Sequence, residues 1–241
     1  MLIIGGSELF HAASKWSLDI ASKIVDMVFY SSVPQNNELI KEAKGQFWNG
    51  IVVDRTEIEN YIDEADSILI GPGMTRSPET ENTVNSLLSK YSDKKWIIDA
   101  GALQMMNPKL LNSNCIITPH QGELTQLLNN LGASSIDSLI ALGCTILLKG
   151  PIDHIYQHQQ IIEVEGGNAG MTKGGTGDVL AGLVAALTCT QDALASTVTA
   201  SYVNKMAAEK LYAEVGPYFN ASDLVTIIPE VLWESIKVAS N

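Results

Sequence analysis

The alternation of short, continuously apolar runs with helical segments constrains this chain more than any other feature of its sequence. Most of these runs lack a polar residue at every second position, which is typical of parallel strands buried on both faces of a sheet. Strands that alternate with helices indicate a layered α/β fold with a mainly parallel sheet. The expected strands span residues 2–6, 27–32, 50–54, 67–71, 96–100, 115–118 and 145–150.

The segments between these runs carry helix signals. Ser77 and Pro78 suit the N-cap and the first position of a helix. Residues 151–165 break the alternation with two short extended runs, so we expect an antiparallel hairpin at the edge of the sheet. From about Gly177 onward the chain is almost wholly helical in pattern. Because we find no linker, repeat or low-complexity stretch, we expect a single domain over residues 1–241.

The composition excludes several classes of partner. The chain has 241 residues and a net charge of −12, which argues against a general affinity for nucleic acid or anionic membranes. An anionic ligand would therefore need local backbone N–H groups, a helix N-terminus or single lysines. Cys115, Cys144 and Cys189 form no CxxC pair, which indicates reduced thiols. With no bilayer-length apolar run and no signal-peptide pattern, we expect a cytoplasmic protein.

Polar or glycine-rich residues follow most of the expected strands. In open parallel sheets, ligands bind outside the carboxyl ends of the strands. The fold would bring these separate segments to one rim, which is stronger evidence for a site than any one of them. The segments are Gly5–Ser7, Gly71–Gly73, Asp99, Thr118–His120 and Lys149–Gly150.

A glycine-rich turn leads into an apolar helix at residues 168–187. The N–H groups of Gly175, Thr176 and Gly177 would point out of the helix N-terminus, where the helix dipole favours an anion such as phosphate. Asp178 lies in the first turn of this helix. Its carboxylate could cap the helix, or it could act as a base beside a bound phosphoryl group. The pattern alone favours neither role for Asp178.

Two further motifs at strand ends carry charged or polar side chains that could contact a ligand at the same rim. His120 follows a strand that Pro119 ends, and Glu123 lies in the first turn of the next helix, where its charge suits the dipole. Lys149 ends an apolar strand, so its ammonium group could contact a phosphate. Taken alone, a polar loop, a capping carboxylate and a solvated lysine are the commoner explanations of these three residues.

The histidines do not predict a metal site. His154 and His158 have a suitable spacing, but they fall in the expected hairpin and no carboxylate completes a ligand set. His11 has no partner motif either.

Taken in order, the motifs resemble those of the dehydratases that repair hydrated NADH and NADPH, a family within the ribokinase-like superfamily. The resemblance covers nearly the whole chain. The Gly-Asp motif is shared by the wider superfamily, whereas the segments at 118–123 and 167–171 make the narrower assignment. The landmarks are GGSELFHAA (5–13), ADSILIGPGM (65–74), WIIDAGAL (96–103), TPHQGE (118–123), LLKG (147–150), GNAGMTKGGTGDVLAG (167–182) and ASDL (221–224).

The resemblance implies a ribokinase-like three-layer α/β/α sandwich with a mainly parallel central sheet and an edge hairpin. It implies an enzyme that uses ADP or ATP to dehydrate the 6-hydroxy adduct of the reduced nicotinamide ring, by phosphorylation of the hydroxyl and elimination of phosphate. By position, the residues that contact the hydrate would be Ala13, Gly73, His120 and Asp178. Those that contact the nucleotide would be Lys149, Gly150, Pro151, Ile152, Asp153 and Gly177.

Within this resemblance, Asp178 would take the hydroxyl proton, and the N–H groups at 175–177 would form an anion hole. A divalent metal, Mg²⁺, would neutralise the phosphates, with Glu123 as an indirect ligand. The family also implies a homo-oligomer, such as a tetramer, and an epimerase that acts in trans. Lys173 occupies a position that is usually small in the family, and we expect it to add a charge to the phosphate site.

Two other functions stay open at this point. A small-molecule kinase of the same fold would use the same aspartate and anion hole on a hydroxymethyl heterocycle or a sugar. A non-catalytic nucleotide-binding protein would bind ADP without turnover.

Overall fold

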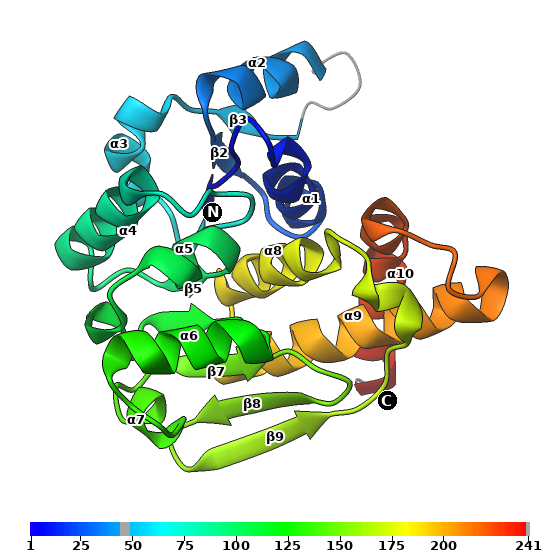
Figure 1. The fold of residues 1–241 in the computed structure, drawn as a ribbon. Helices are drawn as coiled ribbons and strands as arrows, with labels where there is room; N and C mark the ends of the chain where they lie inside the picture. Colours follow the sequence, from blue (N-terminus) through cyan, green and yellow to red (C-terminus); the bar gives the residue numbers. More distant parts are fainter. Residues whose placement is uncertain (44–48, 240–241) are drawn as a thin grey trace.

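The computed structural model describes residues 1–43 and 49–239 and contains one sheet between two layers of helices (Figure 1). The strand order is β3-β2-β1-β4-β5-β6-β7-β8-β9. All pairs are parallel except β7–β8 and β8–β9, which are antiparallel. The strands are β1 (Leu2–Ile4), β2 (Phe29–Ser31), β3 (Ile51–Val52), β4 (Ile68–Ile70), β5 (Trp96–Ile98), β6 (Cys115–Ile117), β7 (Thr145–Leu148), β8 (Asp153–Gln157) and β9 (Gln160–Val164).

The helices cover both faces of this sheet. The α-helices are α1 (His11–Ala21), α2 (Pro34–Glu42), α3 (Glu59–Ile62), α4 (Pro78–Lys90), α5 (Ala100–Met105), α6 (Gln121–Leu131), α7 (Asp137–Ile140), α8 (Thr176–Thr188), α9 (Ala193–Val215) and α10 (Ala221–Ala239). The 3-10 helices are η2 (Arg55–Glu57), η3 (Pro108–Leu110) and η4 (Ala169–Thr172).

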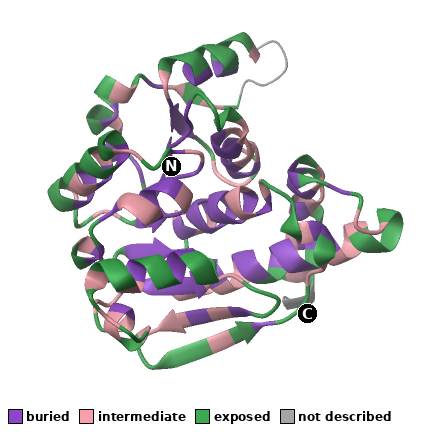
Figure 2. Ribbon diagram, in the orientation of Figure 1, coloured by how far each residue is buried: buried purple, intermediate pink, exposed green. Residues whose placement is uncertain are grey.

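Successive residues of each central strand face different cores. Ile3 packs with helices α1, α8, α9 and α10, whereas Leu2 and Ile4 pack with α3 to α7 on the other face. This follows from the two-residue period of a strand. It also explains the continuously apolar runs, because strands covered on both faces need apolar residues at every position. Figure 2 shows the central strands and most of α8 as buried.

The structure confirms the expected α/β fold. Each expected strand is present, shortened at its ends, and residues 151–165 form the antiparallel edge hairpin β8–β9. Ser77 is the N-cap of α4 and accepts a hydrogen bond from the N–H of Thr80, with Pro78 at the first helical position. The glycine-rich turn leads into α8, which begins at Thr176.

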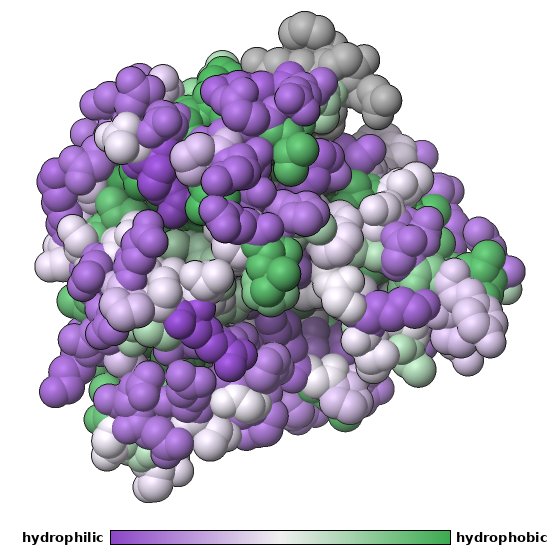
Figure 3. Space-filling view, turned by 45° about the horizontal axis from the view of Figure 1, so that its top comes forward, coloured by the Kyte–Doolittle hydropathy of each residue, from purple (hydrophilic) through white to green (hydrophobic). Residues whose placement is uncertain are grey.

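No helix in the described part of the chain is long and apolar enough to cross a membrane. On the face drawn in Figure 3, hydrophilic residues predominate among the described residues, and hydrophobic residues appear as separate spots.

Candidate active site

The carboxyl ends of neighbouring strands meet at one rim, as the sequence predicts. The N–H of Gly6 donates to the carbonyl of Pro72 over 2.7 Å, which joins the segments after β1 and β4. The N–H of Lys149 donates to the carbonyl of Pro119 over 2.8 Å, which joins those after β7 and β6. Polar residues from distant parts of the chain therefore line one continuous region.

Helix α8 begins at this rim with a glycine whose conformation and surroundings both exclude a side chain. Gly175, the N-cap, has φ of +95°, a left-handed conformation that L-residues rarely adopt. A Cβ at this position would also lie 2.4 Å from the ring of Trp16. The first N–H groups of an α-helix have no intrahelical partner. The start of α8 therefore offers the anion-binding geometry that the sequence predicts for residues 175–177.

Asp178 lies in the first turn of α8 and does not cap the helix, since no side chain accepts a capping hydrogen bond there. The pKa of Asp178 is raised to about 7, mainly by burial and also by the charges of Asp99 and Glu123, while the Lys149 charge opposes the rise. A carboxylate with a pKa near neutrality suits a general base. This environment is consistent with the catalytic role of Asp178, which stays a prediction.

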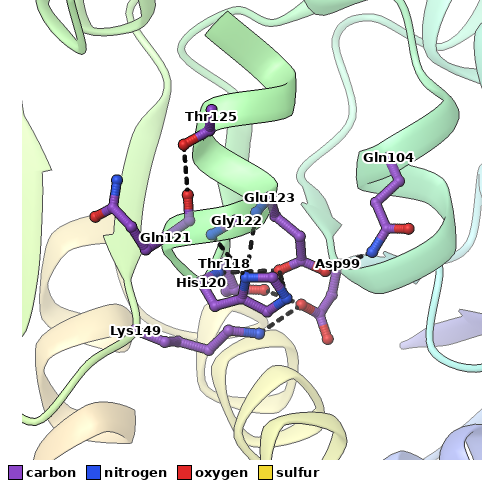
Figure 4. Close-up of polar contacts among 9 residues, drawn as sticks. All are labelled: Asp99, Gln104, Thr118, His120, Gln121, Gly122, Glu123, Thr125 and Lys149. Carbon is purple, nitrogen blue, oxygen red and sulfur yellow. Dashed lines mark hydrogen bonds and ion pairs between the residues drawn. The ribbon is translucent and has the colours of Figure 1, made fainter.

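Lys149 is ion-paired rather than solvated. Its Nζ lies 3.0 Å from Oδ1 of Asp99, and that oxygen also accepts from the Thr118 hydroxyl over 2.8 Å (Figure 4). Burial lowers the pKa of Lys149, but the charges of Asp99 and Glu123 outweigh it, so the pKa is raised overall. A Cβ on Gly177 would lie 3.5 Å from this ammonium group, so a permanent positive charge lies beside the start of α8.

His120 and Glu123 form a capping box at the start of α6. Nδ1 of His120 accepts from the N–H groups of Gly122 and Glu123 over 3.0 and 3.1 Å. Oε2 of Glu123 accepts from the N–H of His120 over 2.9 Å, and its Oε1 accepts from Nε2 of Gln104 over 2.9 Å (Figure 4). Because Nδ1 is an acceptor, a neutral His120 carries its proton on Nε2. The buried Glu123 therefore links α5 to the His120 segment.

The larger of two cavities at this rim has a volume of about 660 Å³. Its lining includes Lys149 and Gly177, which carry an ammonium and an N–H group, and the apolar side chains of Met171 and Leu180. Such a combination suits a ligand with a phosphate group and a flat apolar part. The full lining is His120, Lys149, Gly150, Pro151, Asp153, Gly166, Gly167, Asn168, Ala169, Met171, Thr172, Thr176, Gly177, Leu180, Asn204 and Lys205.

A buried ion pair that the sequence analysis missed forms part of this lining. Lys205, on α9, is 3% exposed, and its Nζ lies 3.5 Å from Oδ1 of Asp153. The same ammonium donates to the carbonyl oxygens of Gly150, Pro151 and Gly166 at 3.0–3.2 Å. Lys205 therefore joins the turn before β8 to the turn after β9. No local pattern marks it, because all its partners are distant in sequence.

The smaller cavity has a volume of about 440 Å³ and contains Asp178. Two residues predicted to contact the hydrate, Ala13 and Gly73, line it as well. Ala100, another lining residue, has φ of +46°, a strained conformation for a residue with a side chain. The full lining is Phe10, Ala13, Gly73, Met74, Thr75, Arg76, Ala100, Gly101, Gln104 and Asp178.

The two cavities largely separate the residues predicted to contact the nucleotide from those predicted to contact the hydrate. All but one of the residues predicted to contact the nucleotide line the larger cavity, and Ile152 is the exception, with a side chain 39% exposed. His120, predicted to contact the hydrate, lines the larger cavity rather than the smaller one. The roles of the individual residues stay predictions.

The expectation that Lys173 adds a charge to the phosphate site is wrong. Its ammonium group donates to the carbonyl oxygens of Pro217 and Phe219, the latter over 2.6 Å, and it lies over the Phe219 ring. Lys173 lines neither cavity. The long side chain reaches away from the glycine-rich turn to the start of α10, which the sequence spacing could not show.

Among the described residues, no group of three or more His, Cys, Asp or Glu side chains could hold a metal ion. His154 instead lies 3.3 Å from Glu163 across the hairpin.

The mainly parallel sheet between two helical layers, with an acid at the start of a buried helix between two cavities, is a ribokinase-like fold. A ribokinase-like superfamily protein from Enterococcus faecalis has the same fold, with a TM-score of 0.84 over 97% of this chain and 86% of that one, at 22% identity. The family model described as NAD(P)H-hydrate dehydratase matches residues 1–230. The chain therefore belongs to the NAD(P)H-hydrate dehydratase family.

Curated relatives agree with this assignment. The bifunctional NAD(P)H-hydrate repair enzyme Nnr of Methanocaldococcus jannaschii is 34% identical over 96% of this chain and 48% of its own length. The ADP-dependent (S)-NAD(P)H-hydrate dehydratase of Nitrosopumilus maritimus is 31% identical over 96% of this chain and 88% of its own length. The chain thus spans about half the length of the bifunctional relatives that it matches.

Proposed function

We propose that this chain uses ADP or ATP to dehydrate the 6-hydroxy adduct of NADH or NADPH, which restores the reduced nicotinamide. The observation that supports this best is the position of Asp178, a partly buried carboxylate in the smaller cavity, directly after a residue that lines the larger one. Membership of the family and the name of the ADP-dependent relative support the same reaction.

In this proposal the larger cavity holds the nucleotide. Its terminal phosphate lies at the start of α8, where the N–H groups and the nearby Lys149 ammonium stabilise negative charge. The adenine ring of the nucleotide lies against the apolar residues Met171 and Leu180. The ring of the hydrate occupies the smaller cavity, with its hydroxyl toward Asp178.

The chemistry then needs two steps. Asp178 accepts the hydroxyl proton as the oxygen of the C6 hydroxyl attacks the terminal phosphorus, and the nucleotide leaves with one phosphate fewer. The ring nitrogen then donates its lone pair toward C6 as the C6–O bond breaks and phosphate leaves. Loss of a proton from C5 restores the C5–C6 double bond of the dihydronicotinamide.

The proposed Mg²⁺ fits only as an ion that the nucleotide brings. The described residues form no cluster of three metal-binding side chains, and Glu123 already accepts from His120 and Gln104. Mg²⁺ usually keeps several waters and binds substrate phosphates with one or two carboxylates. When bound, it would neutralise phosphate charge, and Glu123 would act on it through water.

The proposal is tested by incubating NADH hydrate and NADPH hydrate with the protein and ADP or ATP in separate reactions. Recovery of the absorbance of reduced nicotinamide in an ADP or ATP reaction, but not without nucleotide, supports dehydration. No recovery with either nucleotide overturns the proposal. Phosphorus NMR distinguishes a kinase of the same fold, which would accumulate a phosphorylated compound instead of free phosphate.

The homo-oligomer and the epimerase acting in trans stay predictions. Light scattering on the purified protein tests the first. Faster repair of an epimeric hydrate mixture when an epimerase is added tests the second.

A further inference from the structure

The two arginines of the chain, Arg55 and Arg76, lie in different environments. Arg55 is partly buried, and its Nη2 donates to the carbonyl of Gly5 over 2.9 Å. Arg76 is exposed, and no hydrogen bond or ion pair joins its side chain to any other residue that the structure describes. A guanidinium carries a permanent charge and several N–H donors in one plane. The donors of Arg76 are therefore available to a ligand.

Arg76 lines the smaller cavity, as Asp178 does. Among the described residues of this lining, Arg76 is the only cation and Asp178 the only anion. The chain as a whole has a net charge of −12, which disfavours the approach of an anionic ligand. Of the side chains that line this cavity, Arg76 alone can attract a negatively charged group.

The main chain on both sides of Arg76 is held in place. Before it, the N–H of Met74 donates to the carbonyl of Gly71 over 2.9 Å, and a side chain at Gly101 would clash with the carbonyl of Met74. After it, Ser77 caps α4. Only the long side chain of Arg76 is free to move. Its guanidinium can therefore reach a ligand in this cavity without breaking a contact within the protein.

We propose that Arg76 binds the phosphate that the substrate carries on the ribose of its nicotinamide half, and so selects phosphorylated nicotinamide ligands over the free riboside. This inference rests on the proposed function, which assigns the ring to the smaller cavity. In the hydrate of NADH or NADPH, a ribose joins the ring to a diphosphate. A ring in the cavity therefore brings the diphosphate close to the same lining, where Arg76 is the only cation.

The two charged side chains of the cavity would also orient the substrate. Arg76 directly precedes the N-cap of α4, whereas Asp178 lies in the first turn of α8, so their charges come from different elements. The guanidinium attracts the diphosphate and the Asp178 carboxylate repels it. This combination favours the pose with the ring hydroxyl at Asp178 over a reversed one. An uncharged heterocycle or sugar would gain nothing from Arg76.

The test compares two stable ligands that differ only in this phosphate. Reduced nicotinamide mononucleotide carries it, and reduced nicotinamide riboside does not. Calorimetry is done with saturating ADP, which in the proposed function fills the larger cavity and keeps the ligand phosphate away from the start of α8. We expect the wild-type protein to bind the mononucleotide about 10- to 100-fold more tightly, as for a hydrogen bond to a charged group. In Arg76→Gln the preference should fall to within about twofold.

The ratio of the two affinities distinguishes phosphate binding from a structural role. If Arg76 only supported the cavity wall, Arg76→Gln would weaken both ligands equally and leave the ratio unchanged, which would overturn the inference. Lys109→Gln is the matched control, because it removes the same charge from an exposed residue that lines neither cavity, and it should keep the wild-type ratio.

Two further outcomes separate this inference from its alternatives. If Arg76→Gln changed only the preference between NADH and NADPH, Arg76 would contact the 2′-phosphate of the adenosine half, and the inference would be wrong. A wild-type protein that repairs the hydrate but binds the mononucleotide and the riboside equally would refute the inference alone. A preference for the mononucleotide without repair would refute the proposed function alone.

Discussion

Gly177 and Asp178 are neighbours in the sequence, yet Gly177 lines the larger cavity and Asp178 the smaller one. An α-helix turns by 100° per residue, so consecutive residues of its first turn point in different directions. The start of α8 therefore forms the wall between the cavities. A phosphoryl group bound at the N–H groups on one side would be adjacent to a hydroxyl bound at the carboxylate on the other.

Asp178→Asn should abolish most of the turnover and leave nucleotide binding intact. The amide cannot accept the hydroxyl proton, and a positioned general base contributes about 10²–10⁴-fold to a rate. All of the residues predicted to contact the nucleotide except Ile152 line the other cavity, so the Kd for ADP should change little. Steady-state kinetics and calorimetry on the same preparations measure both. Unchanged turnover would remove Asp178 from the mechanism.

The pH profile of kcat/KM should report the ionisation of Asp178. A general base acts when deprotonated, and burial raises its pKa to about 7. Activity should therefore fall about tenfold per pH unit below about pH 7 and level off above it. Because the Lys149 charge lowers the pKa of Asp178, Lys149→Met should move the midpoint to higher pH. A midpoint near pH 4 in the wild type would contradict this environment for Asp178.

The central strands and the glycine-rich turn could be predicted because their signals are local. A strand buried on both faces needs a continuous apolar run, as Ile68–Ile70 shows. The turn before α8 needs a glycine at 175, because its backbone is left-handed there. In both cases a few consecutive residues determine the structure.

The polar framework of the site could not be predicted, because packing rather than sequence pattern pairs its members. The sequence left Lys149 as a phosphate contact or a solvated lysine, and it did not show that the ends of β5 and β7 bring its ammonium group to Asp99. Lys173 looked suited to the same task, but its side chain reaches Phe219. Both side chains are long and flexible, so their sequence positions do not specify where the charge lies.

Asp178→Asn should also make the protein more stable at alkaline pH. The folded pKa of about 7 lies above the value of 3.8 for an unperturbed aspartate, so the folded state holds the proton more tightly than the unfolded state between these values. The free energy of unfolding therefore decreases, through the ionisation of Asp178, as pH rises from about 4 to 7. Removing the buried charge should stabilise the fold by on the order of 2–4 kcal/mol at pH 8.

Urea unfolding at pH 8 and pH 5 tests this prediction. The gain of Asp178→Asn over the wild type should be clearly larger at pH 8, since at pH 5 the folded wild type already carries the proton. Equal gains at both pH values would show that another effect of the amide, rather than the buried charge, changes the stability.

Lys205→Met should destabilise the protein by about 3–5 kcal/mol, because removing one partner of a buried ion pair leaves the other uncompensated. Asp153, 5% exposed, would keep only its hydrogen bonds from the N–H of Gly150 and the hydroxyl of Ser201. Lys210→Met is the matched control, since Lys210 lies on the same helix, pairs with exposed glutamates and should affect stability little.

The double variant Lys205→Met with Asp153→Asn identifies the cause of that loss. If the uncompensated charge of Asp153 dominates, neutralising it should recover part of the stability, so the two changes should not add. If the contacts of Lys205 with the carbonyls of Gly150, Pro151 and Gly166 dominate, the double variant should be no more stable than Lys205→Met. In either case the turns around the larger cavity lose their common partner, so the Kd for ADP should rise in both variants. An unchanged Kd would show that these turns hold their positions without Lys205.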